Sequence, residues 1–139
     1  MKKTILIFTI FLCIAPFSVA KSQYKDLTSF FESDTAFYSL SNFINSNKIL
    51  IVDQKNKIFP SEKEFKNQVN STNQTIKIIS TIPKEKNYLL LGDYIINENL
   101  AIISFADSIK KNDIIYTFKR TNKTNEWWIL LCISKGKIN

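Results

Sequence analysis

The chain has 139 residues, with 19 Lys and Arg against 12 Asp and Glu, so its formal net charge is +7. It contains no histidine, which excludes histidine general bases, imidazole-dependent catalytic triads and histidine metal sites. Arg120 is the single arginine, whereas proteins that read nucleic acids usually depend on the arginine fork. We therefore expect no nucleic-acid partner.

Residues 1–20 predict a secretory signal peptide. Lys2 and Lys3 precede a short apolar run over residues 4–14, and Ser18 and Ala20 supply the small side chains that a signal peptidase requires. We place cleavage after Ala20. The export signal is typical of Gram-negative bacteria and favours the periplasm, with the extracellular space as the alternative.

Two other interpretations of this segment remain open. The first is an uncleaved membrane anchor, which the short apolar run and Pro16 disfavour. The second is a lipoprotein attached at Cys13, against which the bulky Leu12 argues. After cleavage we expect no stable membrane anchor.

Residues 21–139 fit a single domain with one core. Removing Lys2 and Lys3 lowers the net charge from +7 to +5. The scattered lysines are explained by codon bias of an AT-rich genome or by a basic face for an acidic partner. Cys132 is the one cysteine left, so no intramolecular disulfide can form. Because it lies in the apolar run 128–133, we expect it to be buried, with pairing between chains as the alternative.

The first half of the mature chain predicts mostly helix. Residues 23–46 show helical spacing, and Ser33 with Asp34 indicates a cap between two successive helices. A short strand follows at residues 49–52. Ser61 and Glu64 have the spacing of a capping box and predict a helix over residues 62–70.

The second half predicts five strands joined by short polar links. Such strands form an antiparallel meander, and Gly92 inside one of them indicates a bulge. The predicted strands cover residues 75–82, 88–96, 100–109, 114–120 and 126–134. The expected fold class is therefore α+β, with N-terminal helices packed on a curved, mainly antiparallel, cone-like sheet.

This order of elements resembles the nuclear transport factor two-like superfamily, the α+β cone shared with ketosteroid isomerase and polyketide cyclases. Residues 116–120 and 125–130 are similar to the closing hairpin of that family, and residues 30–37 to segments of its small secreted bacterial members. A cystatin-like helix-plus-sheet fold without the cone is the alternative.

The resemblance implies an Asp or His base, often with a Tyr donor, inside the cone. No catalytic motif matches residue by residue. Asp53, Asp93 and Asp107 are the available carboxylates near predicted strands, and Tyr94 and Tyr116 the available phenols. Since turns explain the first two carboxylates, we assign no catalytic, cofactor-binding or metal-binding residue and expect no cofactor. The candidate partner-binding residues are Tyr88, Trp127 and Trp128.

These observations favour a secreted, non-catalytic binding protein, and within that class an immunity or inhibitor protein that neutralises a toxin or hydrolase. The expected partner is thus another protein. One alternative is a small-ligand-binding or isomerase-like enzyme that uses the cone cavity. Another is a surface-interaction factor outside the cell. A homodimer through the open sheet is compatible with all three.

Overall fold

A computed structural model of the protein describes residues 23–67, 73–121 and 127–138. The predicted signal peptide therefore lies outside the described residues. In chain order the elements are β1 (Gln23–Tyr24), the 3₁₀ helix η1 (Ser29–Glu32), α1 (Asp34–Ile44), β2 (Lys48–Val52), β3 (Lys63–Lys66), β4 (Thr75–Ile79), β5 (Leu89–Ile96), β6 (Leu100–Asp107), β7 (Asn112–Lys119) and β8 (Trp128–Lys137).

The strands form one mixed eight-stranded sheet in the order β1-β8-β7-β6-β5-β2-β4-β3. Strands account for 47% of the described residues and helices for 14%. The expected class, several N-terminal helices packed on a cone-like antiparallel sheet, is therefore wrong. The meander exists only from β5 to β8, because β2 inserts between β4 and β5 and pairs in parallel with both.

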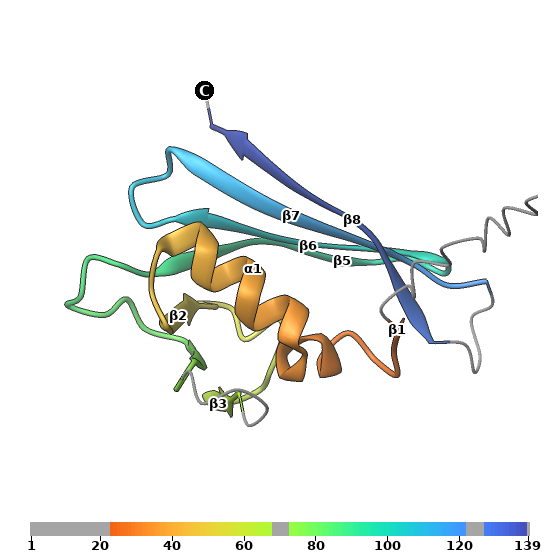
Figure 1. Ribbon diagram of the computed structural model, residues 1–139, viewed down its shortest axis with the longest axis horizontal. Coiled ribbons are helices and arrows are strands. Elements are labelled where there is room, and N and C mark those ends of the chain that lie inside the picture. The colour runs from red at the N-terminus through yellow and green to blue at the C-terminus, as the bar shows by residue number, and fades with distance from the viewer. Residues whose placement is uncertain (1–22, 68–72, 122–126, 139) are drawn as a thin grey trace, which may run out of the picture.

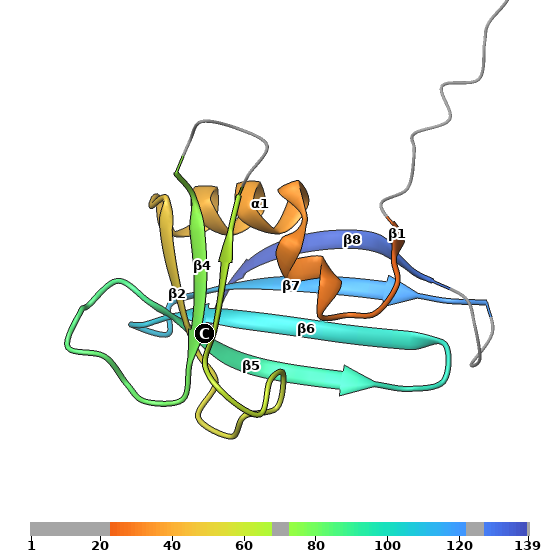
Figure 2. The ribbon, with the colours of Figure 1, turned by 90° about the horizontal axis from the view of Figure 1, so that it is seen from below.

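The sheet has two parts, one formed by β5 to β8 and the other by β2, β3 and β4, and it bends sharply where they meet. Figure 1 shows β5 to β8 as a long, gently curved ribbon with α1 on one face. The turned view shows β2, β3 and β4 running steeply across β5 and β6 (Figure 2). Because β2 and β5 share only the pairs Ile51–Leu89 and Val52–Leu90, the twist of the sheet can separate the two parts beyond that point.

The helix predicted over residues 62–70 is also wrong, as far as the structure describes it. Lys63–Lys66 form β3, which pairs antiparallel with β4. Phe65 is opposite Ile76 and its ring stacks 6.1 Å from that of Phe31. A capping box contributes about 1 kcal/mol, and burial of a phenylalanine contributes more. Tertiary packing therefore overrides the local helix signal.

Helix α1 begins and ends where local chemistry predicts. The Ser33 side chain accepts a hydrogen bond from the Ala36 N–H at 3.2 Å, which confirms the predicted cap. Asn45 ends the helix in the left-handed conformation with φ of 53°. One side of the helix buries Phe37 and Leu40 against the sheet, so α1 covers one face of β5 to β8.

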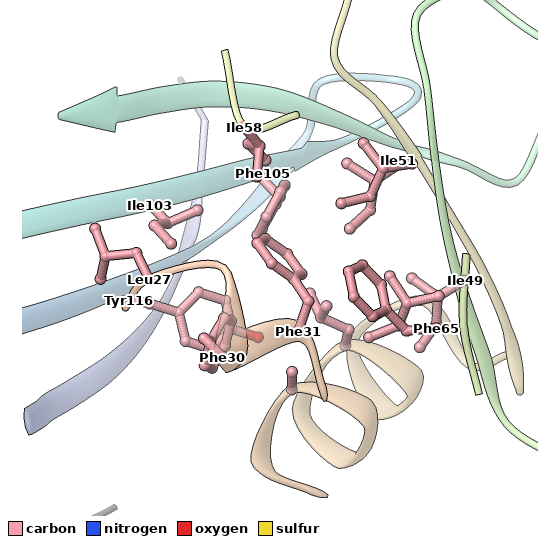
Figure 3. Packing of buried hydrophobic residues seen from close by; sticks show 14 of the residues in the cluster. Leu27, Phe30, Phe31, Ile49, Ile51, Ile58, Phe65, Ile103, Phe105 and Tyr116 are labelled. Atoms are coloured by element: carbon pink, nitrogen blue, oxygen red, sulfur yellow. The ribbon is translucent and has the colours of Figure 1, made fainter. Parts of the chain in front are cut away.

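Aromatic rings fill the space between α1, η1 and the sheet (Figure 3). The Phe30 ring centroid lies 4.7 Å from that of Tyr116 and 5.3 Å from that of Phe118. Phe31 lies 6.3 Å from Phe105 in this part of the sheet and 6.1 Å from Phe65 on β3 in the other part. No exposure is measurable for Phe30, Phe31, Phe105, Tyr116 and Phe118. Each such burial stabilises the fold by about 1.5–3 kcal/mol, so one continuous core joins the two parts of the sheet.

The bulge predicted at Gly92 is confirmed. The register of β5 against β6 shifts between Leu91 and Tyr94. There the Asp93 N–H donates to Ser104 Oγ at 2.7 Å. A Cβ at position 92 would lie 2.7 Å from the same oxygen, which explains the glycine.

Candidate interaction surface

The face of β5 to β8 that points away from α1, here called the outer face, carries apolar side chains at its centre. Its side chains follow from the register, because strand neighbours that pair directly point to the same side. One row crosses the four strands as Ile95, Ile102, Thr117 and Cys132. The members of this row are aliphatic, hydroxyl or thiol side chains, so none carries a charge.

Neighbouring rows extend this apolar area. We define the outer patch by the side chains it contains: Ile95, Leu100, Ile102, Ile115, Ile129 and Cys132. Ile95 is 47% exposed and Leu100 is 41% exposed, and the other isoleucines are half-buried by neighbours within the sheet. A solvated sheet face normally carries polar side chains, so this mostly β-branched apolar patch is a candidate interaction site.

The outer face also carries charged side chains, within and beside the patch. Lys119 is exposed between two patch residues, Leu100 and Ile129. Asp93 is held at the bulge by Ser104, and Asp113 pairs with Gly136 near the start of β7. Protein interfaces commonly combine apolar and charged side chains in this way.

A second bulge, in β8, sets the position of Cys132. Thr117 pairs with Cys132, whereas its neighbour Phe118 pairs with Leu130, so Leu131 is the extra residue. The extra residue reverses the alternation, and Cys132 points to the outer face although Leu130 points inward. The expectation that Cys132 is buried is therefore wrong, because its side chain is exposed.

The three predicted partner-binding residues do not form one surface. Trp128 is 4% exposed, opposite Tyr24 in the sheet, and the Arg120 guanidinium lies 4.4 Å above its ring. Trp127 is 53% exposed at the start of β8. Tyr88 is half-buried next to the start of β5, which is the opposite end of the sheet. Eight-residue strands separate these ends by about 26 Å.

The sequence identified the strands of the outer patch but missed the patch itself. The alternation of side chains along each strand defined its two faces. It could not show which face α1 covers, nor that the extra residue in β8 moves the following side chains to the opposite face.

The carboxylates considered for catalysis have local structural partners. Asp53 is 2% exposed, and its Oδ2 accepts the Ile58 N–H at 2.8 Å. Asp107 accepts the Lys111 N–H and the Asn112 side-chain amide, each at 2.7 Å. Desolvation opposes ionisation of Asp107, but these hydrogen bonds outweigh it and hold its pKa below the ordinary value. Each carboxylate thus organises its own turn.

Tyr94 is the phenol that comes nearest to the expected Asp–Tyr arrangement. Burial raises its pKa, and the negative charges of Asp26 and Asp53 raise it further. The hollow beside Asp53, about 170 Å³, is lined by main chain and side chains including Lys55, Lys57 and Gly92. It opens at the loop after β2.

The space below α1, where the cone-cavity alternative places a ligand, is instead occupied by Phe30, Phe31 and their neighbours.

Neither helix in the described part of the chain has the length and apolarity needed to cross a membrane. Within residues 23–67, 73–121 and 127–138, no three Asp, Glu or Cys side chains gather as metal ligands.

Comparison with family models, with curated proteins and with solved structures finds no match. The outer patch and the packed core are therefore the observations on which a function can be argued.

Proposed function

We propose that this protein is an exported, non-catalytic binding protein that holds another protein against the outer patch. Within that class we propose an immunity or inhibitor protein that neutralises a toxin or hydrolase in the periplasm. The observation that carries the proposal is the outer patch, a group of uncharged and mostly β-branched side chains on the outer face of β5 to β8.

A protein partner fits this surface better than a small ligand does. The patch lies on an open sheet face and not in a concavity, and small molecules bind in clefts that enclose most of their surface. A protein can cover such a face and remove its apolar area from water, at about 25 cal/mol for each Å². Lys119 and the carboxylates Asp93 and Asp113 then contribute specificity.

The chemistry of the chain supports binding over catalysis. No histidine is present, and the three aspartates near the strands are hydrogen-bonded. Asp53 and Asp107 accept main-chain N–H groups of their own loops, and Asp93 accepts the Ser104 hydroxyl of the neighbouring strand at 3.3 Å. A general base needs a free carboxylate within hydrogen-bond reach of a bound substrate. A buried Asp53 that fixes the Ile58 N–H serves the loop instead.

The test is capture from an envelope extract followed by an activity assay on the captured protein. The wild type, Ile95→Glu and Tyr38→Glu are compared. Ile95 lies in the outer patch, whereas Tyr38 is 71% exposed on α1, on the other side of the sheet. We expect Ile95→Glu to weaken capture by about tenfold or more, because a carboxylate is desolvated at the interface, and Tyr38→Glu to retain it.

The captured protein must then lose toxic or hydrolytic activity when the wild type is added, and keep it with Ile95→Glu. Equal capture by a correctly folded Ile95→Glu variant would contradict the use of the outer patch. A captured protein with unchanged activity would contradict the inhibitory role. Fractionation of cells that express the chain with and without residues 1–20 tests export separately.

A further inference from the structure

Most of β8 forms an edge of the sheet. The strand covers Trp128–Lys137, but β1 pairs only with Trp128 and Ile129. In the part of the chain that the structure describes, residues 130–137 have β7 on one side and no strand on the other. Their outward N–H and C=O groups form a template for a further strand. The short β1 pairing shows that this edge accepts an antiparallel strand.

The predicted mature chain cannot cover this edge by extending β1. Cleavage after Ala20 leaves only two residues before Gln23, and these span about 7 Å. The eight uncovered residues of β8 span about 27 Å. With cleavage after Ala20, a strand that pairs with all eight residues comes from another molecule.

The uncovered end of β8 is basic on its inner side. Lys135 is opposite Ile114 and Lys137 is opposite Asn112, so both lysines lie on the same face of the sheet as α1. They line an open hollow of about 460 Å³, together with Asn42 and Phe43 from the end of α1. Ile133, two residues earlier on the same side, is 37% exposed. A strand added here would meet first an apolar side chain and then two positive charges.

Asp107 lines the same hollow and adds one negative charge to it, and its oxygens accept the Lys111 N–H and the Asn112 amide. No ion pair joins Lys135 or Lys137 to a carboxylate of residues 23–67, 73–121 or 127–138. Lys110 and Lys111 in the turn between β6 and β7 add positive charge at the same end of the sheet.

We propose that an extended acidic segment of a protein partner adds to this edge as a strand antiparallel to β8. The main chain of the segment pairs with residues 130–137. Two carboxylates at alternate positions face Lys135 and Lys137, and an apolar side chain faces Ile133. A second copy of this chain fits less well, because its own β8 brings further lysines to the edge. The inference rests on the proposed function only in taking a protein as the partner, and it uses a surface different from the outer patch.

The test uses a fluorescent ten-residue synthetic peptide in which glutamate alternates with valine. A second peptide has the same side chains but N-methyl groups on alternate residues, so that it cannot pair as a strand. Fluorescence anisotropy gives the dissociation constants, and amide shifts in an NMR spectrum locate the binding. The protein variants are Lys135→Glu/Lys137→Glu and, as a matched control, Lys63→Glu/Lys66→Glu on β3, the edge strand at the other end of the sheet.

We expect the glutamate peptide to shift the amides of residues 130–137, and the β8 double variant to weaken binding by about tenfold or more. The β3 double variant should bind as the wild type does. Equal binding of the N-methylated peptide would overturn the proposal, since charge alone would then suffice, as for any polyanion. Equal loss in both double variants, or concentration-dependent dimerisation without peptide binding, would also overturn it. Because the probe is synthetic, none of these failures affects the capture test of the outer patch.

Discussion

Ser39 on α1 and Tyr116 on β7 share a hydrogen bond of 2.7 Å between their hydroxyl oxygens, across 77 residues of sequence. This bond joins the helix to the centre of the sheet. Tyr116 has no measurable exposure, so the bond is inaccessible to water. The Tyr24 hydroxyl, also in the core, has no hydrogen-bond partner among the described residues.

These two phenols allow a matched pair of substitutions. Tyr116→Phe should lower the free energy of unfolding by about 1 kcal/mol, because it removes a satisfied buried hydrogen bond. Tyr24→Phe should leave stability unchanged or raise it, because it removes a buried hydroxyl with no partner. Urea unfolding curves measure both. The opposite order of the two variants would show that Tyr24 has a partner in solution.

Alkaline pH should destabilise the protein through Tyr116. Burial raises the pKa of Tyr116 far above its ordinary value, the Ser39 hydrogen bond partly opposes this effect, and the nearby Tyr24 adds to it. The folded state therefore favours the neutral phenol. That contribution is fully present below the pKa of about 10 in the unfolded chain, and it is lost as pH rises above that value.

The free energy of unfolding, measured between about pH 9 and 11, should fall more steeply for the wild type than for Tyr116→Phe. An ultraviolet titration should show one tyrosine that ionises well above the ordinary pKa of about 10, and Tyr116→Phe should remove that step. Identical pH slopes for the two proteins would contradict this role of Tyr116.

Gly92→Ala should destabilise the protein by about 1–3 kcal/mol. The new Cβ would lie 2.7 Å from Ser104 Oγ and displace the acceptor of the Asp93 N–H. In a Ser104→Ala background that oxygen is absent, so Gly92→Ala should lower the free energy of unfolding by clearly less. A double-mutant cycle with chemical denaturation measures this coupling. Additive effects of the two substitutions would exclude the proposed clash.

Cys132 should react with a thiol reagent in the folded protein. Its side chain is exposed on the outer face, so labelling requires no denaturant. Cys132→Ser should remove one reactive thiol and change the free energy of unfolding by less than about 0.5 kcal/mol. If the Cys132 thiol reacted with the reagent only after unfolding, its side chain would be buried in solution, as the sequence predicts.

The local signals of the sequence were reliable where chain neighbours decide the structure. Ser33 caps α1 as predicted, because the N–H that it accepts belongs to the adjacent turn. Gly92 marks a bulge because its missing Cβ leaves room for Ser104. The apolar runs of β2 and of β4 to β8 were recognised with small errors at their ends.

The same signals failed where distant residues decide. The capping box at Ser61 and Glu64 predicted a helix, but pairing with β4 and burial of Phe65 against Phe31 made β3. The insertion of β2 between β4 and β5 was equally invisible, since parallel pairing depends on contacts between segments far apart in sequence.

The sequence by itself determined the composition of this protein, the absence of histidine, the predicted export signal and most of the strands. Only the tertiary structure decided which surfaces remain uncovered. Among the described residues, the position of α1 leaves the outer face of β5 to β8 open, and the shortness of β1 leaves residues 130–137 of β8 with a strand partner on one side only. The bulge at Leu131 turns Cys132 outward. The physical reason is that alternation defines two faces of a strand, whereas packing against distant elements chooses the one that water reaches.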